Sequence, residues 1–386
     1  MDWLGRDRAT GYLWLLALLN SAMLVFLVAA SHGGVDRNGF LLGSDFISFW
    51  TSGQMLHQGA NVYDGAAHIA AQRQYFASAD GYTAFFYPPS FLPLCWPLGW
   101  LGYFPALAAW LLATGTAYLI AVRPWWQRAG TGMPLWLLFL AYPAVPIVID
   151  HGQTSFLIAG LLGLGVLLAG KRPVLAGVLF GLATIKPQFG PLIPLALLLT
   201  REWKVFIVAA LTALLLAGLS VLIFGGGIWS GWLAASARAQ AAMEAGSVPF
   251  GKMVSLFAAA RLLGAPVAAA YALQAIAALG TALCIGVLCR GRKWSPGLGA
   301  ATLTGALLVT PFALDYDLVL LAFPLLWLVG EGLRRGFLDW EKLGILTAFV
   351  APALARPVAL NTGMPFMPLV VALLFALVVR RVRRTA

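Results

Sequence analysis

The sequence predicts an all-α protein, a polytopic transmembrane helical bundle of about 10–13 spans. Hydrophobic residues make up 61% of the 386 residues and charged residues only 10%, whereas a soluble domain carries about 25% charged residues. The mean hydropathy is +0.86. Apolar runs recur along the whole chain, and no stretch between them is long enough for a second globular core. We therefore expect residues 1–386 to form a single polytopic membrane domain.

The net charge of +11 is distributed as in a membrane protein rather than as in a nucleic-acid-binding protein. Basic residues gather at the ends of apolar spans, at Lys171-Arg172, Arg201 with Lys204, Arg290 with Arg292-Lys293, Arg334-Arg335 and Arg380-Arg381 with Arg383-Arg384. Such runs mark cytoplasmic loops. We therefore expect membrane lipids, and no nucleic acid, as partners of these charges. The three cysteines lie in apolar segments and show neither metal-site spacing nor a disulfide framework.

The first predicted helix covers about residues 12–30 and follows two arginines, so we expect its start in the cytoplasm. Ala29-Ala30-Ser31 is a passable signal-peptidase site. Because the apolar run has about 19 residues, enough to span a membrane, we expect the helix to be retained. Residues 31–86 then form the first outer loop, where Asp64 is placed to cap an interfacial helix that runs to about Ala77.

The remaining spans follow from the apolar runs. Residues 88–122 fit one kinked span with an outer re-entrant turn or two short spans, and we take a single crossing. Further spans are predicted at residues 134–149, 154–169, 174–185, 188–199, 205–224, 267–288, 297–313, 318–329, 343–355 and 366–379. The two spans that flank Lys186-Pro187 are too short for a core of about 30 Å, so we expect a bent hairpin there. Both termini then lie in the cytoplasm.

This threading brings polar motifs from separate spans to the outer face. They are Asp45, Tyr87-Pro88-Pro89, His151-Gly152-Gln153, Lys186-Pro187-Gln188, Lys252, Asp315-Tyr316-Asp317 and Arg356. Polar groups that converge on one side of a membrane protein indicate a site. Asp45 has two possible duties there. Its carboxylate could cap a helix by accepting from the amides of Ile47 or Ser48, or it could act as a general base.

Each of the other motifs also has a structural explanation. Tyr87-Pro88-Pro89 is a rigid turn that can simply lead into a helix. His151 and Gln153 could solvate a turn, and Lys186 could extend from the end of its span to the interface. Asp315 and Asp317 leave a divalent ion or a helix cap open, although no zinc-like ligand spacing is present. We expect no cofactor and no metal ligand, although the acidic pair Asp315 and Asp317 leaves the binding of a divalent ion open.

The motif order resembles glycosyltransferase family 87, polytopic enzymes of the C-type glycosyltransferase fold. The similarity rests on Asp45-Phe46, on Gly59 with Tyr63-Asp64, on Tyr87-Pro88-Pro89, and on the Gly152-Gln153 and Lys186-Pro187 pairs. The resemblance implies transfer of a sugar, mannose being the better guess, from a polyprenyl-phosphate donor to an acceptor hydroxyl. It implies an inverting reaction on the outer face of the cell membrane, with a glycolipid or glycan as acceptor.

The resemblance also implies residue roles. Asp45 becomes the catalytic base, and Lys186 binds the donor phosphate with help from Arg356 and Lys252. His151, Gln153, Tyr87, Tyr316 and Asp317 become sugar or acceptor contacts. Relatives often carry an aromatic residue and an acidic residue or a histidine near Tyr316, after a proline like Pro311, and this chain has no histidine there, which puts any histidine-dependent role in doubt. The alternative is a transporter or lipid flippase, which would favour ionisable groups in mid-membrane and two similar halves.

Overall fold

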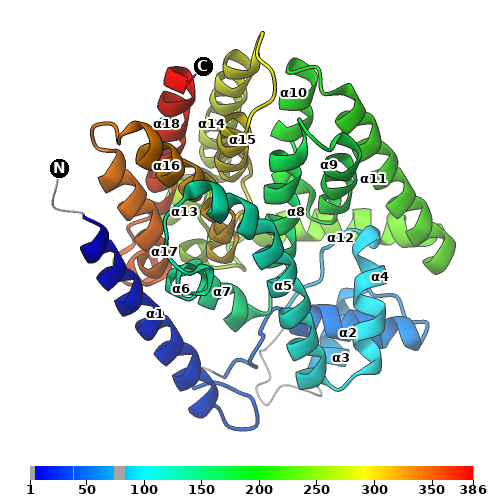
Figure 1. Ribbon diagram of the computed structural model, residues 1–386. Coiled ribbons are helices and arrows are strands. Elements are labelled where there is room, and N and C mark those ends of the chain that lie inside the picture. Colours follow the sequence, from blue (N-terminus) through cyan, green and yellow to red (C-terminus); the bar gives the residue numbers. More distant parts are fainter. Residues whose placement is uncertain (1–4, 38, 74–82, 386) are drawn as a thin grey trace.

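The computed structural model describes residues 5–37, 39–73 and 83–385. Within these ranges the chain is helical, and β-pairing is limited to isolated bridges. The all-α prediction is therefore confirmed (Figure 1). The α-helices of the first half are α1 (Arg6–Ala29), α2 (Phe46–His57), α3 (Gly65–Arg73), α4 (Leu92–Cys95), α5 (Tyr103–Ala129), α6 (Leu135–Ala141), α7 (Ala144–His151), α8 (Ser155–Leu168), α9 (Pro173–Leu182) and α10 (Leu192–Leu199).

The second half continues with α11 (Trp203–Phe224), α12 (Gly227–Glu244), α13 (Leu256–Leu262), α14 (Val267–Cys289), α15 (Pro296–Val309), α16 (Ala322–Arg335), α17 (Glu341–Thr362) and α18 (Met367–Thr385). Short 3-10 helices join them: η1 (Pro89–Phe91), η2 (Trp96–Trp100), η3 (Ala183–Ile185), η4 (Pro187–Phe189), η5 (Phe250–Lys252) and η6 (Asp315–Leu321). Both proline motifs of the sequence begin a 3-10 turn, η1 at Pro89 and η4 at Pro187, and Lys186-Pro187 also separates η4 from η3.

Six helical segments are long and apolar enough to cross a membrane. They are α1, α5, α11, α14, α17 and the continuous segment Asp315–Arg335. Shorter apolar helices cover Ser155–Leu168, Pro173–Ile185 and Pro296–Val309. The protein is therefore a multi-pass membrane protein. The prediction of one continuous span over 134–149 is wrong, because the chain leaves helical geometry at Tyr142, just before Pro143, and forms α6 and α7 instead.

The segment after α1, as far as the structure describes it, forms helices and defined contacts rather than a polar linker. α2 packs on α4 and η2 so closely that a Cβ on Gly53 would lie 2.3 Å from the carbonyl oxygen of Cys95 in α4 and 2.8 Å from the amide nitrogen of Gly99 in η2. The indole of Trp50 donates to the carbonyl oxygen of Leu101 (2.9 Å), and the side-chain amide of Gln54 donates to the carbonyl oxygen of Gly99 (2.8 Å). These bonds fix the direction of α2 and hence the place of the residue before it.

The predicted cap of the next helix is confirmed, since Oδ1 of Asp64 accepts from the amides of Ala66 and Ala67 at 3.0 and 3.2 Å. α3 is described only to Arg73, so the expected end near Ala77 lies outside the described residues. The sequence did not predict α12 or α13, which lie between the expected spans over 205–224 and 267–288. α12 packs beside this loop, where Arg238 donates to the carbonyl of Tyr63 (2.6 Å).

α5 connects two opposite ends of the molecule. At its beginning the hydroxyl of Tyr103 donates to the carbonyl of Gly43 (2.8 Å), two residues before Asp45. At its other end the carbonyl of Arg128 accepts from Arg334 (2.5 Å). A helix of 27 residues is about 40 Å long, so these two ends lie on opposite sides of any membrane that α5 crosses. Figure 1 shows α5 running up from the group formed by α2, α3 and α4.

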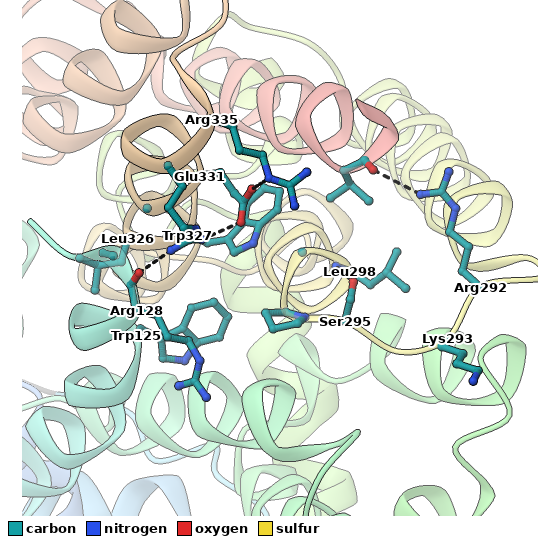
Figure 2. Close-up of a pocket in the computed structure, with 16 residues that line it drawn as sticks. Trp125, Arg128, Arg292, Lys293, Ser295, Leu298, Leu326, Trp327, Glu331 and Arg335 are labelled. Carbon is teal, nitrogen blue, oxygen red and sulfur yellow. Dashed lines mark hydrogen bonds and ion pairs between the residues drawn. The ribbon is translucent and has the colours of Figure 1, made fainter. Parts of the chain in front are cut away.

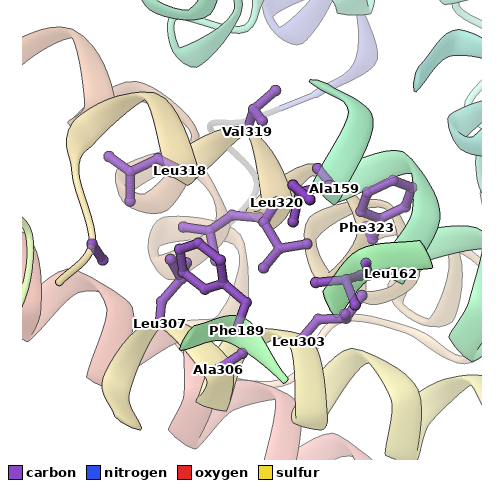
Figure 3. Packing of buried hydrophobic residues seen from close by; sticks show 14 of the residues in the cluster. Ala159, Leu162, Phe189, Leu303, Ala306, Leu307, Leu318, Val319, Leu320 and Phe323 are labelled. Carbon is purple, nitrogen blue, oxygen red and sulfur yellow. The ribbon is translucent and has the colours of Figure 1, made fainter. Parts of the chain in front are cut away.

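A dense apolar core holds η6 in place between α8 and α15. Figure 3 shows Leu320 of η6 next to Phe189 and Leu307, while Val319 points away from them, and all four are buried. A 3-10 helix satisfies its carbonyls poorly. Two buried tyrosines compensate, because the hydroxyls of Tyr118 and Tyr142 donate to the carbonyls of Val319 (3.0 Å) and Leu318 (2.7 Å). This packing fixes the acidic motif that begins η6.

Candidate active site

Asp45 stands at the amino end of α2 but its side chain does not cap that helix. Its backbone amide donates to the carbonyl of His151 (3.0 Å). Its Oδ2 accepts from Nε2 of Gln153 (2.7 Å), a residue 108 positions away. No other hydrogen bond to this carboxylate is made by the part of the chain that the structure describes. The capping explanation is therefore wrong, and the carboxylate is half-buried with Oδ1 open.

Gln153 is the centre of a hydrogen-bond network between three segments. Its Nε2 donates to Asp45 and, at 3.3 Å, lies within reach of the Tyr316 hydroxyl. Its Oε1 accepts from the hydroxyl of Tyr87 (2.9 Å) and from the amide of Thr154 (3.0 Å). Burial raises the pKa of the Tyr87 phenol well above its usual value, so Tyr87 stays a neutral donor. The amide of Gln153 is thus held in one orientation, and it fixes Oδ2 of Asp45.

His151 joins the network to α17. Arg356 can only donate, so its Nη2 donates to Nε2 of His151 (3.1 Å). Nδ1 of His151 then carries the proton and donates to the carbonyl of Ile147 (3.0 Å). Oδ2 of Asp150 lies 3.5 Å from the same Nδ1. Burial raises the pKa of the Asp150 carboxyl.

Arg356 forms a bidentate pair with Asp315. Its Nε and Nη2 donate to the two carboxylate oxygens at 2.5 and 2.9 Å. The Asp315 side chain is 1% exposed and that of Arg356 is 23% exposed, so the arginine forms the accessible side of the pair. Nη1 of Arg356 has no hydrogen-bond acceptor among the described residues. Two donor hydrogens are therefore available to a ligand.

Lys186 and Asp317 form a second, fully buried ion pair. Nζ of Lys186 lies 2.5 Å from Oδ1 of Asp317, and the two side chains are 4% and 3% exposed. Oδ1 also accepts from the hydroxyl of Ser155 (2.7 Å), and Oδ2 accepts from the amide of Leu314 (3.1 Å). The lysine also lies 5.0 Å from the ring centre of Tyr316. Lys186 is thus shielded from ligands, while Asp317 is saturated with donors.

The structure brings together eight of the nine residues singled out in the sequence. Six are Asp45, Tyr87, His151, Gln153, Tyr316 and Arg356, and the other two are the ion pair of Lys186 with Asp317. Lys252 does not join them by a hydrogen bond or ion pair within the described ranges. Its Nζ lies 5.6 Å from the ring centre of Phe40. Sequence reasoning missed Thr154 and Ser155, which carry no signal beyond following Gln153. In the described part of the chain, no three His, Cys, Asp or Glu side chains cluster as metal ligands would.

These features define a helical membrane protein with a preorganised polar site at the end of the bundle where α5 begins. The chain belongs to glycosyltransferase family 87, which it matches over residues 85–311. It is therefore a membrane glycosyltransferase. The matched region contains Tyr87, His151, Gln153, Lys186 and Lys252, while Asp45 precedes it. No curated protein and no solved structure matches the chain.

Proposed function

We propose that the protein transfers mannose from a polyprenyl-phosphate donor to an acceptor hydroxyl on the outer face of the cell membrane, with inversion at the anomeric carbon. The observation that supports this best is the state of Asp45. Its carboxylate is fixed by Gln153 through Oδ2 and is not used as a helix cap. A base in this state can take the acceptor proton through Oδ1 while the hydroxyl oxygen attacks the sugar.

The open Oδ1 matters because a general base must reach the proton that it removes. Asp317, the other candidate carboxylate, already accepts from Lys186, Ser155 and Leu314. Asp315 is bound by both arms of Arg356. Asp45 is therefore the carboxylate of this network best suited to accept a proton. As the acceptor oxygen bonds to the anomeric carbon, the bond to the donor phosphate breaks, and the polyprenyl phosphate leaves with the electron pair.

The leaving phosphate needs donors that stabilise its growing charge. Arg356 supplies Nη1 for this role, because Nε and Nη2 are already held by Asp315 and His151. Lys186 does not contact the phosphate directly in this arrangement, since its side chain is 4% exposed and is paired with Asp317; it supports the site by holding that aspartate. Lys252 remains a candidate contact for a more distant part of the donor. We assign Tyr87, Gln153, Tyr316, His151 and Asp317 to sugar or acceptor binding, directly or by fixing their neighbours.

The donor test separates this proposal from its alternatives. Purified full-length protein in lipid vesicles is given radiolabelled mannosyl phosphoryl polyprenol, a nucleotide-linked mannose, or neither, together with a short mannoside as a glycan acceptor. We expect transfer from the polyprenyl donor alone. Transfer from the nucleotide sugar without a polyprenyl carrier would overturn the donor assignment. Movement of the lipid-linked sugar across the vesicle without a new glycosidic bond would favour a flippase.

The outer-face assignment has its own test. Gln58 in the first loop and Gln127 near the other end of α5 are both exposed, so each can be replaced by cysteine in a background lacking Cys95, Cys284 and Cys289. A membrane-impermeant thiol reagent added to intact cells should label the cysteine at 58 and not that at 127. The reverse pattern would place the site on the cytoplasmic face.

A further inference from the structure

A cavity of about 440 Å³ lies at the end of the bundle opposite Asp45. It opens between α5, α15, α16 and α18, and Figure 2 shows the side chains that line it. The floor is apolar, with Trp125, Leu298 and Trp327 all buried. The rim is basic, as it includes Arg128, Arg292, Lys293, Arg334 and Arg335. This combination differs from the candidate active site, where each buried aspartate has a cation beside it.

The rim carries more positive charge than the protein itself neutralises. Glu331 is the one acidic residue that lines the cavity within the described part of the chain. It pairs with Arg334 (2.7 Å) and, less closely, with Arg335 (3.3 Å). Five cations against one carboxylate leave a formal charge of +4 around one opening. Like charges gathered this closely repel each other, and a bound anion removes that cost.

Helix ends account for only part of this charge. Arg334 donates to the carbonyl of Arg128, and Arg128 donates to that of Pro124 (3.0 Å), as expected for cations near helix C-termini. Arg292 makes one hydrogen bond with the described residues, a long one of 3.4 Å from Nη1 to the carbonyl oxygen of Val382. Lys293 is exposed and has no hydrogen bond or ion pair within the described ranges. These last two side chains are therefore available to a ligand.

A third feature of the cavity also favours an anion. α15 begins at its edge, and the side chain of Ser295 caps that helix by accepting from the amide of Leu298. The partial positive charge of a helix N-terminus adds to that of the rim. The apolar floor below the rim suits glycerol and the first methylene groups of an acyl chain, which a free inorganic ion does not have.

We propose that this cavity binds the phosphodiester headgroup of an anionic phospholipid, on the membrane face opposite to the glycosyl-transfer site. Arg292 and Lys293 contact the phosphate, and the tryptophan-lined floor receives the glycerol. The placement supports a lipid, because the cavity lies at the C-terminal end of α5, a candidate membrane span, and phospholipid headgroups are expected at the ends of membrane spans. The proposal is independent of which donor or acceptor the enzyme uses.

Lipid retention measures the proposal directly. The full-length protein is exchanged into detergent micelles with phosphatidylcholine or phosphatidylglycerol, and bound lipids are counted by native mass spectrometry during titration. The pocket variant is Arg292→Gln/Lys293→Gln. The control is Arg290→Gln/Arg201→Gln, which removes the same charge from exposed residues that do not line the cavity. A basic residue near anionic lipid strengthens binding about fivefold, so the pocket variant should bind phosphatidylglycerol roughly 30-fold more weakly.

The control variant should lose less than about threefold in affinity, and phosphatidylcholine should bind weakly to all variants. Equal weakening of the pocket and control variants would refute a specific site. Displacement of the lipid by millimolar inorganic phosphate would refute the lipid assignment in favour of a small soluble phosphate. The charge-preserving variant Arg292→Lys/Lys293→Arg should retain binding and fold, so that a loss in this variant also contradicts the proposal.

Discussion

Replacing Asp45 by asparagine tests the proposed mechanism most directly. The substitution keeps the size of the side chain and an oxygen that can accept from Gln153, but it removes the base. No cap is lost, because the Asp45 side chain does not cap α2. One charge-assisted hydrogen bond becomes a neutral one, so the free energy of unfolding should fall by about 1 kcal/mol. Loss of a general base should instead lower turnover by about 10²–10⁴-fold, which corresponds to about 3–5 kcal/mol in the activation barrier.

The assay is transfer from the polyprenyl donor under saturating conditions, with thermal unfolding and donor binding measured on the same samples. Asp64→Asn is the matched control. It lies in the same loop and loses the same charge, but its carboxylate caps α3. The control should lose stability of up to about 1 kcal/mol and keep near-normal turnover. If Asp45→Asn turned over within about threefold of the wild type, the reasoning would be refuted. Asp150, with its carboxylate 36% exposed, would become the next candidate.

Three further predictions concern charge in the site and its loop. Lys186→Met should lower the free energy of unfolding, measured by denaturant titration, by about 3–5 kcal/mol, because it leaves Asp317 buried without a cation. The double variant Lys186→Met/Asp317→Asn should recover most of this lost stability. Arg356→Lys should raise the donor KM about tenfold or more, because one ammonium cannot hold both oxygens of Asp315 and the phosphate; an unchanged KM would exclude the arginine from the phosphate site. Burial lowers the pKa of His68 from 6.5 to about 4, so the unfolded chain binds the extra proton first as pH falls. Stability should be full above pH 6.5 and drop by on the order of 3 kcal/mol by pH 4, and His68→Gln should flatten that profile.

Hydropathy predicted the long spans well. The expected spans over 205–224 and 267–288 correspond to α11 (Trp203–Phe224) and α14 (Val267–Cys289). Hydropathy failed where the backbone, rather than the polarity of the side chains, determines where a helix ends. The apolar run over 134–149 is interrupted at Tyr142-Pro143, and hydropathy does not record the restriction that a proline places on its predecessor. Hydropathy also did not predict α12, because its polar residues interrupt any continuous apolar run.

The sequence predicted most of the residues that form the site, but not which of them contact each other. The predicted order of spans placed Asp45, Lys186 and Arg356 at one face, because successive loops alternate between the two sides of the membrane. The choice of partner is a tertiary property. Lys186 reaches Asp317 across 131 positions and Asp45 reaches Gln153 across 108. Local sequence also favoured Asp45 as a helix cap, and only the observed hydrogen bonds exclude this.

The two ends of α5 use cations differently, and this difference has a consequence for donor selection. In the site, each strong cation is neutralised by an aspartate, Lys186 by Asp317 and Arg356 by Asp315. A membrane contains many anionic lipids, and an open cluster of cations would attract all of them without regard to what they carry. Neutralised cations offer directed hydrogen bonds but little long-range attraction. On the proposed function, the donor is therefore selected by its sugar and by the N–H groups of Arg356. On the proposed lipid site, the uncompensated basic rim at the other end of α5 attracts anionic phospholipids.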